Sequence, residues 1–406
     1  MNGPLSGIRV LDLSRVLAGP WATQLLGDYG ADVVKVERPG AGDDTRHWGP
    51  PWLEGQDPGD GQESAYFLAT NRNKRSLAVD LSSQPGQELI RALAAQADVI
   101  VENFRAGTLQ RWGLDPERLR DRNPGLIVCS ISAFARDSSR GNEPGYDAMI
   151  QASAGLMSIT GPAQEEGGEP QKVGVAIADI MCGMYAATAI LAALHARTQS
   201  GRGQSIEVPL YDSQVAWLAN QAMNFLVGGV VPGRLGTAHP NIVPYQAFAT
   251  ADGHVMVAVG NDRQFAECVR CCGLAELAAD PRFRRNADRL ANRAQLIALL
   301  SDAFAREPTG FWLRELGAAG VPSSPINDIG EVFSNDYADE SGLVRRMSHP
   351  YDPGLPTVAN PVRLSADAVS YRRAPPLLGQ HSGEVLADWL GYSAETIAEL
   401  RKAGTI

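Results

Sequence analysis

The chain has 406 residues, 44% of them hydrophobic and 20% charged, which is typical of a soluble globular protein with two or three domains. The formal net charge of −10 argues against a nucleic-acid or anionic-membrane partner, because either would need a broad basic surface. The five cysteines lack the spacing of a disulfide framework, and the first residues lack a secretory signal, so we expect a cytoplasmic protein.

The first half of the chain alternates short apolar segments with helical ones. Strands are expected at 8–13, 32–37, 98–102, 126–131 and 205–209, and helices at 20–29, 85–96, 116–122, 180–197 and 211–227. This alternation predicts a parallel sheet covered by helices on both faces. Ligands bind such a sheet at the carboxyl ends of its strands. We therefore expect a large α/β domain over residues 1–227.

The sequence changes character after residue 228. Gly228–Gly236 is a loop rich in chain-breaking residues, and Asp252-Gly253 between two alternating segments indicates a hairpin. Helices are expected near 261–273, 289–306 and 309–319. These features predict a small α+β domain over 228–330, followed by a segment, 331–406, that returns to the large domain.

Two segments raise other possibilities. Val173 to Ala196 is apolar enough to suggest a membrane span, but it contains Asp179 and residues that do not suit a lipid-facing surface, so a buried helix is favoured. Cys268-x-x-Cys271-Cys272 suggests a zinc or redox site. No second cysteine pair or paired histidine follows at ligand spacing, so we expect core cysteines and no bound metal.

Basic residues gather where the expected strands end. They are Arg38 after the second strand, Arg72, Lys74 and Arg75 before the next apolar stretch, and Arg105 and Arg111 after the strand at 98–102. Such a set suits a ligand with several phosphates, and Phe104 or Trp112 is available to stack on a base. Any one of these cations could equally be solvated surface charge. The chain has no phosphate-loop motif and no G-x-G-x-x-G after its first strand, which argues against an ATPase and a standard dinucleotide dehydrogenase.

Asp179 is the only charged residue between Val173 and Gly183, and an alanine-rich helix follows it. It could be the N-cap of that helix. It could also be a carboxylate nucleophile, because a helix N-terminus favours the ionised form and an apolar pocket excludes water. The two interpretations are compatible.

Short motifs run nearly end to end through the chain. They are Pro4-Leu-x-Gly-Ile-Arg-Val-Leu-Asp12, Val16-Leu-Ala-Gly-Pro20, Leu26-Gly-Asp-Tyr-Gly-Ala-Asp-Val-Val-Lys-Val-Glu37, Asn73-Lys-Arg-Ser76, Asp98-Val-Ile-Val-Glu-Asn-Phe104, Gly145-Tyr-Asp147, Gln151-Ala-Ser-Ala-Gly-Leu-Met157, Arg197-x-x-x-Gly-Arg-Gly-Gln204 and Pro375-Pro-Leu-Leu-Gly-Gln-His-Ser382. In this order they resemble the class III CoA transferases, which include formyl-CoA, carnitine and several dicarboxylate CoA transferases.

The resemblance implies that Asp179 is the catalytic nucleophile. It implies CoA contacts at Val16, Ala18, Arg38, Asn73, Lys74, Arg75, Asn103, Phe104 and Arg111. It also implies a Rossmann-like large domain with a parallel sheet, a smaller α+β domain and a homodimer of interlocked rings. Acyl-CoA and a carboxylic acid are then the substrates, and no cofactor is tightly bound.

The implied mechanism proceeds through covalent intermediates on Asp179. The carboxylate attacks the donor thioester to give an acyl-aspartyl anhydride, and the CoA thiolate then forms an enzyme–CoA thioester. The acceptor carboxylate reverses these steps. Exchange of one thioester for another is nearly energy-neutral, so no ATP site is needed. Backbone amides near a helix start would stabilise the oxyanions.

Related activities give alternatives. The same fold hosts α-methylacyl-CoA racemases, whose catalytic histidine stands where this chain has Tyr146. A tyrosine has an ordinary pKa of about 10, which suits proton transfer at neutral pH poorly and favours the transferase. A CoA-binding protein without catalysis is a third possibility, against which the retained Asp179 argues.

The loop after residue 228 bears on the substrate. Formyl-CoA transferases carry a run of glycines there and a glutamine at the position of Leu17, and this chain has neither. The stretch Gly236–Phe248 looks most like the dicarboxylate branch, the succinate and glutarate type. His239 in this stretch could bind the distal carboxylate of such a substrate, or it could be a loop histidine held by backbone groups.

Overall fold

The computed structural model describes residues 3–57 and 61–406, which form two compact units. The first unit contains the chain up to Leu156, residues 173–227 and residues 337–406. The second contains residues 157–172 and 228–336. The domain limits expected from the sequence, 1–227, 228–330 and 331–406, stay a prediction.

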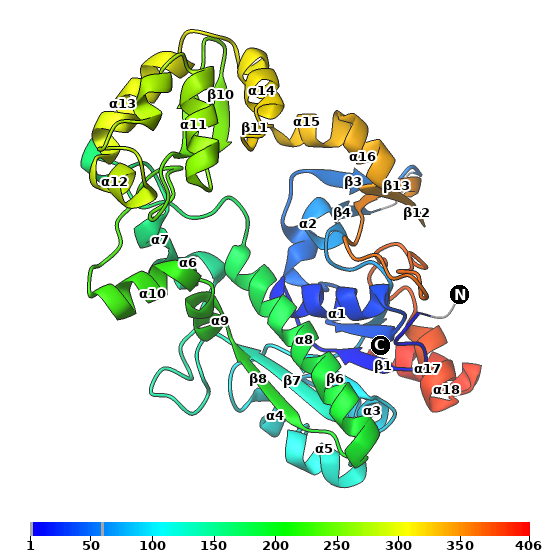
Figure 1. Cartoon of the computed structure of the whole chain (residues 1–406). Helices are drawn as coiled ribbons and strands as arrows, with labels where there is room; N and C mark the ends of the chain where they lie inside the picture. The colour runs from blue at the N-terminus through cyan, green and yellow to red at the C-terminus, as the bar shows by residue number, and fades with distance from the viewer. Residues whose placement is uncertain (1–2, 58–60) are drawn as a thin grey trace. The chain divides into compact units, whose positions relative to one another are not determined.

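A parallel sheet of six strands forms the centre of the first unit, in the order β5-β2-β1-β6-β7-β8 (Figure 1). The strands are β1 (Arg9–Asp12), β2 (Asp32–Glu37), β5 (Lys74–Ala78), β6 (Val99–Glu102), β7 (Ile127–Ser132) and β8 (Ser205–Pro209). The predicted α/β class with a parallel sheet is confirmed.

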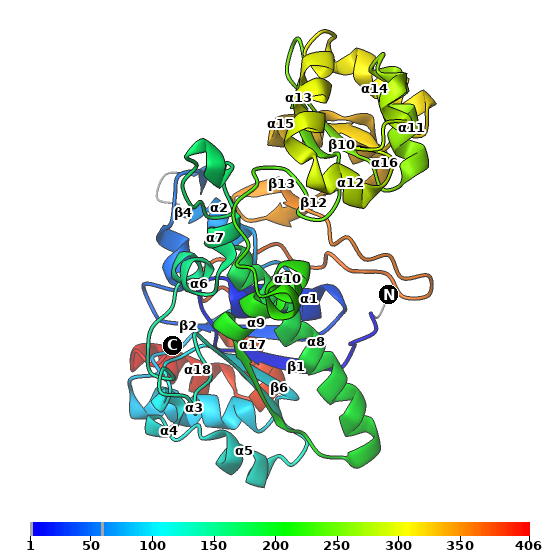
Figure 2. The same cartoon turned by 60° about the vertical axis from the view of Figure 1, so that its left-hand side comes forward.

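Side chains alternate between the two faces of this sheet, and both faces are buried. Val10 and Val33 pack against α1 (Ala18–Asp28) and α8 (Ile177–Ser200), while Leu11 and Val34 face the opposite helix layer. Figure 1 shows α1 and α8 side by side across one face, and Figure 2 shows the other helices beyond the sheet. That opposite layer contains α3 (Gln84–Ala94), α4 (Thr108–Arg111), α5 (Pro116–Arg122), α17 (Ser382–Leu390) and α18 (Ala394–Lys402).

Helix α8 is long and apolar enough to cross a membrane by length and composition, and 44% of its most apolar window is buried. One side of the helix belongs to the core that includes Cys182, Ala186 and Ile190, and it packs on α1 and the sheet. Apolar residues of α8 therefore cover one face of the sheet.

The structure adds one strand and corrects one helix. The basic segment before Leu77, for which no strand was predicted, begins the edge strand β5 (Lys74–Ala78), whose buried cations have acidic partners. The helix expected at 211–227 is two helices, α9 (Leu210–Ala216) and α10 (Ala219–Gly228). Ala219 has a φ of 44°, which a continuous right-handed helix does not allow.

Shorter elements complete the first unit and its edges. They are η1 (Asp44–His47), β3 (Trp52–Glu54), β4 (Gln62–Ser64), α2 (Ala65–Leu68), α6 (Asp147–Ser153), α16 (Asp336–Ser341), β12 (Val344–His349) and β13 (Asp352–Val358). The strands pair as antiparallel hairpins, β3 with β4 and β12 with β13. Helix α6 comes directly before the segment that leads to α8, so it bears on the site described below.

The second unit contains an antiparallel sheet in the order β11-β10-β9 with helices packed on it. The predicted hairpin is present, and Gly253 O accepts a hydrogen bond from Thr250 N at its turn. Its elements are α7 (Leu156–Ile159), η2 (Gln164–Glu166), β9 (Tyr245–Ala249), β10 (His254–Ala258), α11 (Asp262–Cys271), η3 (Ala275–Ala278), α12 (Asn286–Ala291), α13 (Arg293–Phe304), α14 (Thr309–Ala318), β11 (Ser323–Pro325) and α15 (Ile329–Ser334).

Candidate active site

A cavity of about 300 Å³ lies at the carboxyl ends of the central strands. Segments that follow three strands line it: residues 15–18 after β1, residues 103–106 after β6, and residues 131–133 at the end of β7. Asp179 lines the cavity from the first turn of α8. The topology therefore brings together groups that are more than 160 residues apart in the sequence.

A close helix contact sets the position of Asp179. Asp179 and Gly183 are one helical turn apart and share a face of α8. A Cβ atom on Gly183 would lie 2.6 Å from Ala18 O and 3.2 Å from the Trp21 side chain, so only glycine allows α1 and α8 to approach this closely. The contact places Asp179 beside the start of α1, and Ala18 lines the same cavity.

The carboxyl group of Asp179 has an unusual ionisation. Burial, with a further contribution from the negative charge of Asp147, raises the pKa of Asp179 to about 7. The sequence led us to expect that the helix N-terminus would keep this group ionised, but its pKa is raised because burial disfavours the charged form and a second carboxylate lies nearby. The carboxyl group can therefore change charge near neutral pH.

Asp179 is not the N-cap of α8, as one interpretation of the sequence had it. It is the third residue of the helix, and Asp147 satisfies the helix start instead. Asp147 Oδ1 accepts hydrogen bonds from Ala178 N (2.8 Å) and Asp179 N (3.4 Å), and its Oδ2 accepts one from Gln151 Nε2 (2.7 Å). Asp179 is thus free to face the cavity. In the sequence, Asp147 stands out only as part of the motif Gly145-Tyr-Asp147, and no local signal assigns it this role.

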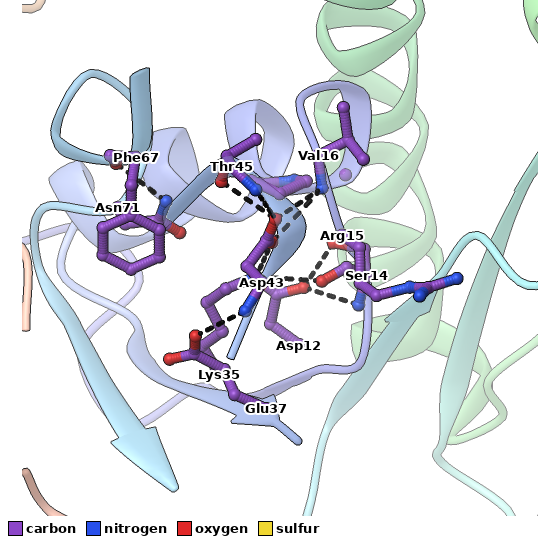
Figure 3. A network of polar contacts seen from close by, with 12 residues as sticks. Asp12, Ser14, Arg15, Val16, Lys35, Glu37, Asp43, Thr45, Phe67 and Asn71 are labelled. Carbon is purple, nitrogen blue, oxygen red and sulfur yellow. Dashed lines mark hydrogen bonds and ion pairs between the residues drawn. The ribbon is translucent and has the colours of Figure 1, made fainter. Parts of the chain in front are cut away.

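The turn after β1 forms one wall of the cavity and is conformationally strained. Val16 has a φ of 71°, in the left-handed region where a β-branched residue is an outlier that costs roughly 1–3 kcal/mol. Figure 3 shows the side chains that surround this turn. Both carboxylate oxygens of Asp43 accept from Val16 N at 3.2 Å, and Lys35 Nζ lies 2.8 Å from Asp43 Oδ2.

A second cavity of about 410 Å³ shares Arg15 and Phe104 with the first, so the two cavities adjoin. Arg38 and Trp112 also line it. The rings of Phe104 and Trp112 pack edge to face with centroids 5.1 Å apart, and Arg15 lies 5.5 Å from the Phe104 centroid. This cavity offers aromatic and cationic groups to a ligand that extends out of the first one.

The structure separates the predicted CoA contacts into two groups. Val16, Ala18, Asn103 and Phe104 line the first cavity, and Arg38 and Phe104 line the second. Asn73, Lys74, Arg75 and Arg111 line neither cavity. Arg105, a member of the basic set predicted to suit a phosphate ligand, lines the first cavity. Arg15 lines it too and was not predicted, and its position shortly after β1 was the available signal.

Asn73, Lys74 and Arg75, called the basic motif below, lie in the protein interior. Lys74 Nζ bonds to Asp12 Oδ2 (3.0 Å) and Pro20 O (2.9 Å), and burial lowers the pKa of Lys74 to about 8 although Asp12 opposes the shift. Arg75 bonds to three acidic side chains, Asp32, Glu384 and Asp388. Asn73 Nδ2 donates to Asp28 Oδ1 and Ser370 O. These contacts join β5 to the core and to the C-terminal segment.

The remaining candidates differ in position. Tyr146 lines the first cavity and is 65% exposed. Arg111 is exposed, and its guanidinium group donates to Thr108 Oγ1 at 3.0 Å. His239 belongs to the second unit, where its ring stacks on Tyr245 and its Nδ1 accepts from Asn241 N at 3.0 Å. The role of each in binding stays a prediction.

The cysteine motif lies in the second unit. Cys268 and Cys272 are buried in the core of the second unit, and all five cysteines are free. Within residues 3–57 and 61–406, no three histidine, cysteine, aspartate or glutamate side chains are grouped as metal ligands.

Comparison with known proteins places this site in a family. The sequence pattern of CoA-transferase family III matches residues 5–382. Succinyl-CoA:glutarate CoA-transferase of Homo sapiens is 44% identical over 403 residues, which cover 99% of this chain and 90% of the human protein. Succinate–glutarate CoA-transferase of Agrobacterium fabrum is 45% identical over 385 residues, 95% of each chain.

A solved structure agrees with these sequence relatives. The CAIB/BAIF family protein from Brucella suis matches with a TM-score of 0.84 and 43% identity, covering 96% of this chain and 100% of that one. The family pattern includes every segment that lines the cavity around Asp179. The chain therefore belongs to CoA-transferase family III and is an enzyme that uses CoA thioesters as substrates.

Proposed function

We propose that this enzyme transfers CoA from succinyl-CoA to glutarate or a similar dicarboxylate, with Asp179 as the nucleophile. The observation that carries the proposal is the carboxyl group of Asp179 in a cavity beside the start of α1, in a chain 44–45% identical to relatives named for succinyl-CoA and glutarate. A pKa of about 7 leaves a substantial share of Asp179 ionised and nucleophilic at neutral pH.

The first half of the reaction forms two covalent bonds in turn. The Asp179 carboxylate attacks the thioester carbonyl of the donor, and CoA leaves as a thiolate, which gives an acyl-aspartyl anhydride. The thiolate then attacks the aspartyl carbonyl and releases the donor acid as a carboxylate. The enzyme now holds CoA as a thioester of Asp179, and the acceptor carboxylate regenerates the free enzyme by the reverse steps.

Backbone amides at the start of α1 are suited to stabilise the oxyanions of these steps. The first amides of a helix have no acceptor within the helix, and they carry the positive end of its dipole. Ala18 is in this first turn and lines the cavity with Asp179. One well-placed amide contributes about 3 kcal/mol to the stability of a transition state in other acyl-transfer enzymes.

The second cavity is suited to the nucleotide end of CoA. Its aromatic pair can pack against the adenine ring, and Arg15 and Arg38 can pair with phosphate groups. Because Arg15 and Phe104 line both cavities, a bound CoA would extend from the second cavity to Asp179. Arg38 has an exposed guanidinium group whose pairing with Asp44 is long, at 3.8 Å, so it is available to a phosphate.

The alternatives from the sequence are not favoured. A racemase would need a proton-transfer group where this chain has Tyr146, and the relatives described above are named as transferases. The same relatives argue against a CoA-binding protein without catalysis. We further propose that the enzyme is a cytoplasmic homodimer, with interlocked subunits as the family resemblance implies.

A transfer assay tests the proposal directly. The purified protein is incubated with succinyl-CoA and a panel of mono- and dicarboxylates, and new CoA esters are read by mass spectrometry. We expect glutaryl-CoA or the ester of a related dicarboxylate from the wild type and none from Asp179→Asn. Asp212→Asn is the matched control, because Asp212 is also the third residue of a helix, α9, but is exposed and lines neither cavity.

Two outcomes would contradict the proposal. Full transfer by Asp179→Asn would exclude this nucleophile. If no acid accepts CoA, yet the α-proton of a 2-methylacyl-CoA exchanges with deuterium, the enzyme is a racemase.

A further inference from the structure

The turn after β1 is held by side chains from other elements at three successive residues. Lys35 Nζ donates to Ser14 O (2.9 Å), and Asn103 bonds to both Arg15 N (2.9 Å) and Arg15 O (2.7 Å). Val16 N donates to both oxygens of Asp43. Figure 3 shows the Asp43 and Lys35 side chains meeting beneath this turn.

The contact from Asp43 is made to Val16, the residue with the strained backbone. An isolated valine would leave the left-handed region, because its branched side chain collides with the backbone there. Such a conformation persists only where the surroundings fix it. Both oxygens of Asp43 accept from Val16 N, so the Asp43 carboxylate is the group that opposes relaxation of this turn.

Asp43 and Lys35 form an ion pair that is almost completely buried, with Asp43 1% and Lys35 0% exposed. The carboxylate also accepts from Thr45 N (3.0 Å) and Thr45 Oγ1 (2.9 Å). Burial would raise the pKa of Asp43, but Lys35 and the Thr45 hydrogen bonds outweigh it and lower the pKa to about 2. The group is therefore an anion throughout the physiological range.

A buried ion pair is not explained by stability alone, since well-packed apolar residues of similar size often stabilise a protein as well or better. The pair supports the one turn that leads directly into α1. Leu17 is the N-cap of α1, and Ala18 begins it beside Asp179. A change in the backbone of Val16 would therefore move the first amides of α1 relative to the nucleophile.

We infer that Asp43 is a positioning residue for CoA transfer: supported by Lys35, it holds Val16 in the left-handed conformation that aligns the start of α1 with Asp179. The inference rests on the proposed function, because it concerns the rate of thioester formation on Asp179. Misplacement of a reacting group by about 1 Å lowers a rate by roughly 100-fold. The step affected is covalent chemistry, so kcat is expected to fall more than KM rises.

Two double variants isolate the hydrogen-bond acceptor at position 43. Lys35→Met with Asp43→Asn removes the ion pair but keeps an oxygen for Val16 N. Lys35→Met with Asp43→Leu removes the ion pair and the oxygen. Both variants lose the hydrogen bond from Lys35 to Ser14 O, so the difference between their kcat values reports the effect of the acceptor at position 43. We expect kcat within about 5-fold of wild type for the Asn variant and about 30- to 100-fold lower for the Leu variant.

Rescue by glycine separates positioning from a general structural effect. Glycine adopts the left-handed region without strain, so Val16→Gly lets the turn form without Asp43. Added to the Leu double variant, it is expected to raise kcat about 5-fold or more, whereas in the wild-type background it is expected to give no increase. Formation of the enzyme–CoA thioester, followed by intact-protein mass spectrometry, reports the same step.

The outcomes are distinct from failure of the proposed function. If the wild type transfers CoA and the folded Leu and Asn double variants have equal kcat, the inference is wrong. If the Leu variant does not fold, Thr45→Val replaces it, because this change removes one hydrogen bond from Asp43 and keeps the ion pair. If Thr45→Val lowers kcat 2- to 5-fold relative to the wild type and Val16→Gly restores it, the inference is supported. If Thr45→Val leaves kcat unchanged, the inference is wrong.

Discussion

Asp179 combines two properties that oppose each other, its proposed role as the nucleophile and a raised pKa. Burial is the larger cause of the shift, and the neighbouring charge of Asp147 adds to it. A protonated carboxyl group cannot attack a thioester, so the free enzyme loses activity as the pH falls through the pKa. Under the proposed mechanism, the burial that raises this pKa therefore also sets the lower pH limit of the enzyme.

This coupling predicts the pH dependence of catalysis. For the wild type, kcat/KM is expected to rise with pH with an apparent pKa of about 7. Asp147→Asn removes one negative charge and keeps an oxygen to cap α8. The pKa of Asp179 is then expected to fall, so kcat/KM should rise at a lower pH than in the wild type. Asp212→Asn is expected to leave the profile unchanged. A profile that does not move in Asp147→Asn would show that Asp147 has no electrostatic effect on Asp179.

The same pKa predicts a cost in stability. The folded protein holds the Asp179 proton up to pH of about 7, whereas the unfolded chain releases it at pH of about 3.8. The unfolded state therefore binds fewer protons between these values, and stability falls as pH rises through this window, by up to about 4 kcal/mol. Asp179→Asn removes this loss, so its Tm should exceed that of the wild type by several degrees at pH 8 and by much less at pH 4.5. If Asp179→Asn changes Tm by the same amount at pH 8 and at pH 4.5, the raised pKa of Asp179 is contradicted.

At the scale of elements, the contact between α1 and α8 determines the site. Gly183 permits the close approach, because an added Cβ would collide with the backbone oxygen of Ala18 rather than with a flexible side chain. Asp179 lies one turn away on the same face, so a separation of the helices would displace this proposed nucleophile from the start of α1. The packing of the two helices is therefore part of the proposed catalytic geometry.

Gly183→Ala tests this dependence. We expect it to destabilise the protein by about 1–3 kcal/mol through overpacking and to lower kcat at least 10-fold. Gly317→Ala in α14 is the matched control, since a Cβ there meets nothing within 4 Å and alanine favours a helix by up to about 1 kcal/mol. Thermal unfolding and the transfer assay measure both variants. Wild-type kcat in Gly183→Ala would show that the close contact is not required.

The basic motif at 73–75 shows that polar and charged residues typical of a surface can be buried at the start of a strand. Three polar or charged residues in succession suit a solvated surface, yet here Lys74 and Arg75 begin β5 directly after Asn73, and the three side chains meet acidic partners from α1, β1, β2 and α17. Removing one partner of a buried pair leaves the other charge unpaired. Lys74→Met is therefore expected to lower Tm by several degrees, because Asp12 loses its ammonium partner. An unchanged Tm together with a raised KM for acyl-CoA would instead support direct CoA contact.

At the scale of the whole molecule, several large apolar side chains are exposed on α10, on the segment after it and on α15. Leu226, Val227, Val230 and Ile329 are each more than 70% exposed. Exposed apolar side chains that cluster mark sites of association, and Leu226, Val227 and Val230 follow closely in the sequence. We propose that a second copy of the chain covers these three residues in the homodimer.

Light scattering tests the oligomeric state. We expect a mass of twice 43.4 kDa for the wild type, and a shift toward 43.4 kDa for Val227→Glu with Val230→Glu, because a buried charge opposes association. Leu299→Glu, at another exposed apolar position, is the control. A monomeric wild type would exclude the dimer.

The sequence by itself determined the class of fold and singled out the proposed nucleophile. Periodic apolar strands and helices depend on local pattern, so the parallel α/β sheet and the hairpin at Asp252-Gly253 could be predicted from it. An isolated carboxylate in an apolar stretch, together with the ordered motifs, was enough to single out Asp179. Strand ends also placed Arg38, Asn103 and Phe104 at a ligand site, and the cavities contain them.

The tertiary structure alone decided how charges pair and which groups face the cavity. Lys74 and Arg75 are buried because their acidic partners come from strands and helices distant in the chain, which no local pattern reveals. Asp147, rather than Asp179, caps α8 because α6 folds back against it. The pKa of Asp179 and the strain at Val16 likewise depend on packing, since burial and long-range hydrogen bonds exist only once the elements have assembled.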